Sequence, residues 1–123
     1  MSIKELIMIV DDEKAICEVL SQMLEKTGYK TITFYDFKPA ELYYKNSYDN
    51  VDIVLMDLNL VDIKGEEAIV KLTQINPDVK VIVLSGYITS SDPNGSIFGA
   101  KRLIQKPVNM MELEKVVREV LDG

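Results

Sequence analysis

The chain alternates between short segments of continuous hydrophobic residues and longer segments in which hydrophobic residues recur at helical spacing. Continuous runs are typical of strands buried on both faces of a parallel sheet, and helical spacing is typical of amphipathic helices that cover such a sheet. The second run alternates with polar residues instead, so we expect it nearer a sheet edge. The pattern predicts five strands, at residues 6–10, 30–34, 51–56, 79–84 and 102–105.

Helices are predicted between these strands and after the last one. Gly28 ends the first helix and Pro77 ends the third, because glycine suits a helix end and a residue before proline avoids the helical conformation. Pro39 is expected to open the second helix, because proline suits the first helical position. Asn109 and Glu112 form a capping-box pattern before the last and most regular helix. The apolar stripes of these helices lie within residues 16–24, 40–43, 69–75 and 113–121.

The segment of residues 85–101 fits this alternation least well. A helix belongs there, and Asp92 followed by Pro93 suits its start, but residues 94–96 (Asn-Gly-Ser) form helices poorly. We expect at most about two turns of helix before Gly99, with above-average mobility.

The alternation of strands and helices predicts an α/β fold. We expect (βα)5, a doubly wound five-stranded parallel sheet with right-handed crossovers and helices on both faces, that is, a three-layer sandwich. No linker, internal repeat or low-complexity tail interrupts the pattern. We therefore expect one domain over residues 1–123.

Composition and charge narrow the range of functions. The net charge of −6 and the pI of about 4.6 argue against direct binding of a nucleic-acid backbone. The chain has no histidine, which excludes most catalytic zinc sites, Ser-His-Asp triads and histidine general bases. No apolar run is long enough to span a membrane and no signal-peptide cleavage site is visible, so we expect a cytoplasmic protein with no membrane contact. The single cysteine, Cys17, is expected in the core of a helix face.

Polar residues follow four of the five predicted strands. Asp11 and Asp12 follow the first, Asp57 the third, Ser85 the fourth and Lys106 the fifth. Each residue alone has an ordinary explanation as a helix cap or turn residue. The carboxyl ends of strands in an open parallel sheet meet at one edge, however, and ligands bind there. We therefore expect these five side chains to converge.

The expected cluster suggests a specific chemistry. Three carboxylates held close together repel one another, and a hard cation such as Mg²⁺ relieves that repulsion with oxygen ligands. A carboxylate beside Mg²⁺ is a suitable nucleophile for phosphorus and would form an aspartyl-phosphate. A lysine and a hydroxyl at the same edge supply donors for the phosphoryl oxygens. The expected activity is that of a phosphoacceptor rather than a metabolic enzyme.

The motifs that carry these residues resemble a known family. "IMIVDDE", "VDIVLMDLNL", "VIVLSGY" and "GAKRLIQKP" occur in the order and at the spacing of the CheY-like receiver domain of two-component response regulators. The resemblance covers essentially the whole chain. It implies a flavodoxin-like fold with strand order 2-1-3-4-5, and a function in phosphorelay signal transduction.

The resemblance also implies how the phosphoryl group is bound. Asp57 would accept it as 4-aspartylphosphate from a phosphohistidine of a sensor histidine kinase. Ser85 and Lys106 would bind its oxygens, and the Lys106-Pro107 peptide would be cis. The change in conformation would control an output domain or effector protein at the face around residues 86–105.

A magnesium site is implied at the same place. Asp12 would bind Mg²⁺ directly and Asp11 largely through water. Asp57 and the backbone carbonyl of Asn59 would complete the protein ligands.

The sequence departs from the family at two points. The family often has proline three or four residues after the acceptor, but here Val61 and Asp62 follow Leu60. The family's switch aromatic, three residues before the lysine, is replaced by Leu103. We therefore predict a less rigid loop, and a signal carried more by ordering of residues 86–98 than by an aromatic side chain.

Two other functions deserve comparison. A constitutive binding module whose pocket no longer turns over would share the fold, but it would show no stabilisation by Mg²⁺. A flavodoxin would need a phosphate-binding loop after the first strand, where "DDEK" would instead repel the phosphate of FMN. We set the flavodoxin aside and keep the inert module as the alternative.

Overall fold

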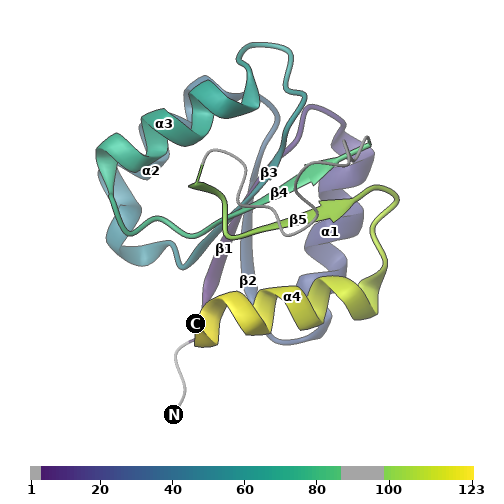
Figure 1. The fold of residues 1–123 in the computed structure, drawn as a ribbon. Coiled ribbons are helices and arrows are strands. Elements are labelled where there is room, and N and C mark those ends of the chain that lie inside the picture. The colour runs from purple at the N-terminus through teal and green to yellow at the C-terminus, as the bar shows by residue number, and fades with distance from the viewer. Residues whose placement is uncertain (1–3, 87–98) are drawn as a thin grey trace.

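A computed structural model describes residues 4–86 and 99–123. These residues form one parallel sheet in the order β2-β1-β3-β4-β5, with helices on both faces (Figure 1). The predicted fold class and the strand order implied by the resemblance are both confirmed, and β2 lies at a sheet edge as expected. The strands are β1 (Leu6–Val10), β2 (Lys30–Phe34), β3 (Ile53–Asp57), β4 (Val81–Ser85) and β5 (Arg102–Gln105). The weak helix expected before Gly99 lies outside the described residues.

The central strands are shifted slightly from their apolar runs. β3 and β4 begin two residues later than the hydrophobic pattern suggests and extend one residue further, to Asp57 and Ser85. The reason is backbone pairing, since Asp57 still pairs with Leu84 and Ser85 with Gln105 in the parallel ladder. The predicted site residues Asp57 and Ser85 are therefore held by the sheet itself.

The helices follow the predicted order. Gly28 has a φ of 100°, a left-handed conformation that suits glycine just after the end of the first helix. The second helix starts two residues before Pro39, which is accommodated in the first turn because its missing N–H has no helical partner there. The helices are α1 (Lys14–Lys26), α2 (Phe37–Ser47), the short 3₁₀-helix η1 (Tyr48–Asn50), α3 (Gly65–Ile75) and α4 (Met110–Asp122).

The cap of α4 is also confirmed. The side chain of Asn109 accepts hydrogen bonds from the backbone N–H groups of Met111 at 2.9 Å and Glu112 at 3.1 Å. Asn109 thus satisfies two of the N–H groups that the first turn of a helix leaves without partners.

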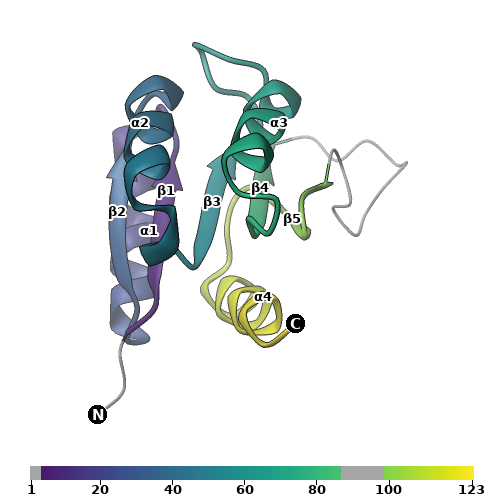
Figure 2. The same cartoon turned by 90° about the vertical axis from the view of Figure 1, so that its left-hand side faces the viewer.

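The core has two layers of buried side chains, one on each face of the sheet, between the strands and the helices that Figure 2 shows around them. Alternate residues of the buried strands point to opposite faces, so Met8 packs with α2 and α3 while Ile9 packs with α1 and α4. Cys17 is fully buried in the second layer, as expected. Leu103 is partly buried against the first layer. The two layers bury both faces of the sheet and leave its carboxyl edge to the polar residues.

Candidate functional site

Three buried polar residues mark the carboxyl edge of the sheet. Asp11 follows β1 and is 0% exposed, Asp57 ends β3 and is 4% exposed, and Ser85 ends β4 and is 2% exposed. β1, β3 and β4 are neighbours, so the three residues lie side by side. A buried charge is costly without partners, and these residues therefore indicate a site rather than chance placement.

The predicted acidic cluster is present. Carboxylate oxygens of Asp11, Asp12 and Asp57 all lie within 4.8 Å of one another. Asp12 is the most accessible of the three, being only partly buried. Oxygen donors at this spacing suit a hard divalent cation, which prefers carboxylates and retains some water.

Lys106 directly follows the carboxyl end of β5, and its side chain contacts the acidic cluster. Its Nζ lies 2.9 Å from Asp11 Oδ2 and 3.4 Å from Asp57 Oδ2. The backbone N–H of Lys106 donates to the Ser85 carbonyl at 2.8 Å, and the Lys106-Pro107 peptide is cis, as the resemblance implied. The lysine thus lies between two of the carboxylates, and its backbone is tied to the end of β4.

Each buried carboxylate is fixed at both oxygens. Asp11 accepts from the N–H of Glu13 at 2.9 Å through Oδ1, and Asp57 accepts from the N–H of Asn59 at 3.1 Å through Oδ1. In both residues Oδ2 is the oxygen that faces Lys106. The backbone therefore orients the acceptor carboxylate and its neighbour in the same way.

Burial and charge shift the protonation of the cluster. Burial raises the pKa of Asp11, and the negative charge of Asp57 adds to this, although hydrogen bonds from Glu13 and Lys106 act in the other direction. Burial alone would lower the pKa of Lys106, but its hydrogen bond to Asp11 and the charges of Asp11 and Asp57 outweigh burial and raise it. Lys106 therefore stays protonated, and it pairs with Asp11 and Asp57. Its single positive charge does not balance the three carboxylates of the cluster, so a further cation would be favourable there.

Sequence reasoning missed two acidic residues near this edge. Glu13 lies 3.9 Å from Lys106 Nζ with an exposed side chain, and the signal for it was its place directly after the Asp11-Asp12 pair. Asp62 accepts hydrogen bonds from the N-terminus of α2, a contact between distant segments that no local pattern of residues indicates. Asn59 lies beside Asp57, while the role of its carbonyl remains a prediction.

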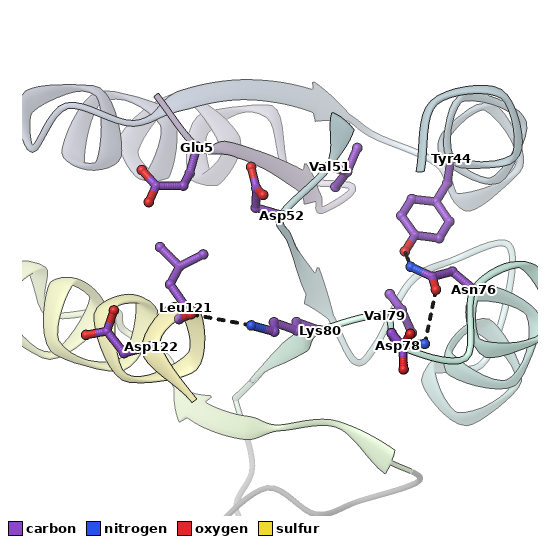
Figure 3. A pocket seen from close by; sticks show the side chains of 10 residues that line it. All are labelled: Glu5, Tyr44, Val51, Asp52, Asn76, Asp78, Val79, Lys80, Leu121 and Asp122. Carbon is purple, nitrogen blue, oxygen red and sulfur yellow. Dashed lines mark hydrogen bonds between the residues drawn. The ribbon is translucent and has the colours of Figure 1, made fainter. Parts of the chain in front are cut away.

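A pocket of about 290 Å³ lies at the opposite, amino end of the strands (Figure 3). Its polar groups are engaged in contacts that join elements: Lys80 Nζ donates to the Leu121 carbonyl at 3.4 Å, and the Asn76 amide donates to the Tyr44 hydroxyl at 3.1 Å. Nothing in the sequence pattern pointed to this pocket.

The fold and the charged cluster together define an α/β domain suited to binding a cation and a phosphoryl group at one sheet edge. Comparison with known proteins identifies the family to which this domain belongs. The family model for the response regulator receiver domain matches residues 7–118, so the chain belongs to the receiver domain family of two-component response regulators. Proteins of this family are phosphoacceptor switches.

Relatives and solved structures agree with this assignment. The chain is 33% identical over 91% of its length to the transcriptional regulatory protein YvrH of Bacillus subtilis, of which it covers 47%. It superimposes with a TM-score of 0.86 on a CheY-like receiver domain protein from Methanospirillum hungatei, at 31% identity, covering 98% of this chain and 95% of that one. A CheX–CheY complex with BeF₃ and Mg²⁺ from Borrelia burgdorferi gives 0.88 at 28% identity, covering 94% and 88%.

The chain spans only part of its curated relatives, between 19% and 56% of their length. The similarity therefore concerns their receiver domains. Within the part of the chain that the structure describes, no helix is both long enough and apolar enough to cross a membrane.

Proposed function

We propose that this chain is a phosphorylation-dependent signalling switch in which Asp57 accepts the phosphoryl group. The observation that carries the proposal is the position of Lys106 Nζ, 2.9 Å from Asp11 and 3.4 Å from Asp57, in a cluster that also contains Asp12. A buried carboxylate with one face held by the backbone and the other by an ammonium group is oriented for attack on an electrophile.

The donor set fits Mg²⁺. Asp11, Asp12, Asp57 and the backbone carbonyl of Asn59 would hold the ion, and all four offer the hard oxygen ligands that it prefers. Bound Mg²⁺ would neutralise charge on the carboxylates and on the phosphoryl oxygens. The BeF₃ and Mg²⁺ present in the Borrelia CheY complex support this assignment by similarity.

The transfer itself needs few groups. An oxygen of Asp57 forms a bond to phosphorus while the phosphorus–nitrogen bond of a phosphohistidine breaks. The electron pair of that bond returns to the imidazole nitrogen, which then takes up a proton. Lys106 binds the phosphoryl oxygens as a fixed positive charge and Ser85 binds them through its hydroxyl, so this chain's contribution is positioning and charge neutralisation.

The remaining roles follow from the same assignment. The phosphohistidine belongs to a sensor histidine kinase, which supplies the histidine that this chain lacks. The domain occupies residues 1–123, acts in the cytoplasm, and controls an output domain or effector through the face around residues 86–105. It assists its own phosphorylation and dephosphorylation and has no separate metabolic substrate.

A small phosphodonor tests the proposal. We expect the intact protein to gain the mass of one phosphoryl group when incubated with acetyl phosphate and Mg²⁺, and to lose it on standing because acyl phosphates hydrolyse. Asp57→Asn removes the nucleophile and should abolish the gain completely. Asp52→Asn, which changes an exposed acid at the other end of β3, should leave it intact.

The result that would overturn the proposal is a labile mass gain that survives Asp57→Asn. A wild-type protein with no mass gain and no stabilisation by Mg²⁺ would instead favour the inert binding module.

A further inference from the structure

The loop of residues 58–64 joins the acceptor strand to α3 and contains Asn59. Its two ends are held closely. The Leu58 N–H donates to the Leu84 carbonyl at 2.8 Å, and Gly65 packs so tightly on Leu58 that an added Cβ would lie 2.7 Å from the Leu58 carbonyl oxygen. Between these ends Leu60 is buried in the core and Ile63 packs partly against it, whereas Val61 is 85% exposed. The short stretch of residues 61–62 therefore has little apolar burial of its own, and a polar contact holds it.

Asp62 provides this contact. Its two carboxylate oxygens accept hydrogen bonds from the Phe37 N–H at 3.1 and 3.0 Å, and Oδ2 also accepts from the Lys38 N–H at 3.2 Å. Phe37 and Lys38 are the first two residues of α2, and the helix's own N-cap residue, Asp36, makes no side-chain capping bond. Asp62 thus caps α2 from another part of the chain.

The partner of this contact is a firmly packed element. Phe37, Ala40 and Tyr44 of α2 are buried in the core layer that also contains α3. The N–H groups at a helix N-terminus carry partial positive charge, so a carboxylate is a favourable acceptor there. Through Asp62 the loop is therefore attached to a helix that is packed into the core.

We propose that Asp62 is a positioning residue for the metal site. By capping α2 it holds the 58–64 loop in the conformation that presents the backbone carbonyl of Asn59 beside Asp57. In this chain a side-chain anchor takes the place of the proline that the family often has after the acceptor. This inference rests on the proposed function, and Asp62 itself touches neither metal nor phosphoryl group.

Two variants at this position separate the hydrogen bonds from the charge. Asp62→Ala removes both, whereas Asp62→Asn removes the charge and keeps an oxygen that can cap the helix. We define the Mg²⁺ midpoint as the concentration at which half of the folded protein has bound the ion, fitted from the rise of the unfolding free energy with Mg²⁺. In Asp62→Ala the bound ion must itself order the loop, so we expect this midpoint to rise by about fivefold, the factor to which the loss of a helix cap corresponds. Asp62→Asn should stay within about twofold of the wild type, because asparagine caps helices as well as aspartate does.

Asp52→Ala is the matched control. Asp52 also accepts a hydrogen bond from the backbone of a distant segment, the Leu6 N–H at 2.9 Å, but at the amino end of the sheet. Its loss should lower the thermal stability in Mg²⁺-free buffer and leave the Mg²⁺ midpoint unchanged. This variant therefore measures the effect of general destabilisation.

Three results would overturn the inference: a Mg²⁺ midpoint for Asp62→Ala equal to that of the wild type, an Asp62→Asn variant as weak as Asp62→Ala, or an equal loss in Asp52→Ala. A second measurement does not depend on the metal. Amide hydrogen exchange of residues 58–64 in Mg²⁺-free protein should be faster in Asp62→Ala than in Asp52→Ala, and equal rates would contradict the anchoring role. If the wild type neither binds Mg²⁺ nor gains a phosphoryl group, the proposed function fails while this exchange test still reports on the anchor.

Discussion

The two ends of the sheet both carry several acidic side chains, but these differ in burial and in their positively charged partners. At the carboxyl end Asp11 and Asp57 are buried, at 0% and 4% exposure, and share one lysine. At the amino end the acids around the pocket of Figure 3 are exposed or half-buried, and Glu5 and Asp122 lie 4.0 and 3.7 Å from the exposed Arg118.

This difference distinguishes a site from a solvated surface. Exposed ion pairs contribute little free energy and are screened by salt. The positions of the acids at the amino end therefore have little effect on the stability of the fold. Buried carboxylates lose their hydration, and a protein retains them only with compensating partners. Burial and a shared counter-charge, rather than the number of acids, therefore identify the functional edge.

The largest expected contrast is between two lysines. Lys106→Met should lower the free energy of unfolding by about 3 kcal/mol, because it leaves buried carboxylates without their counter-charge. Lys80→Met at the amino end should cost less than about 1 kcal/mol, since it removes one hydrogen bond from a half-buried side chain to a carbonyl. Urea unfolding at neutral pH measures both. Equal losses would show that the two ends do not differ as described.

The next contrast concerns metal affinity. Asp12→Ala should weaken Mg²⁺ binding by about tenfold or more, because it removes a proposed direct ligand. Asp78→Ala removes the same charge from the amino-end pocket and should change the affinity by less than about twofold, because that charge is exposed and screened. A Mg²⁺ titration of thermal stability compares the two. A larger loss of affinity in Asp78→Ala than in Asp12→Ala would mean that the cation binds at the amino end of the sheet, and it would contradict the proposed site.

The smallest expected effect is a pH dependence. Because the pKa of Asp11 is raised from 3.8, the folded protein binds a proton more tightly than the unfolded chain does. Without Mg²⁺, wild-type stability relative to Asp11→Asn should therefore fall as the pH rises from about 4 through the raised pKa, and stay constant above it. Unfolding free energies of both proteins across this range test the sign. A relative stability that rises with pH would mean that burial is not the dominant influence on Asp11.

Much of the site could be predicted because it depends on local pattern and topology. The apolar runs mark where strands end, and parallel strands bring those ends together, so the positions of Asp11, Asp57 and Ser85 at this edge are predictable from the sequence. The resemblance added the strand order and the cis peptide before Pro107, both of which the structure confirms.

The contacts that were missed depend on distant parts of the chain. Asp62 caps a helix that begins 25 residues earlier, and that helix was expected to start at Pro39 rather than Phe37. The amino-end pocket likewise combines segments that only the folded chain brings together. Local propensity carries no information on such pairings. The predicted ordering of residues 86–98 lies almost wholly outside the described residues and stays a prediction.

Locating the phosphoryl group on the chain tests the proposed function most directly. Protein treated with acetyl phosphate and Mg²⁺ can be reduced, so that the acyl phosphate becomes a stable alcohol, then digested and sequenced by mass spectrometry. We expect modification at Asp57, with Asp49, Asp52 and Asp62 of the same tryptic peptide unchanged. Modification of Asp52, or equal labelling of acids at both ends of the sheet, would contradict the proposed function.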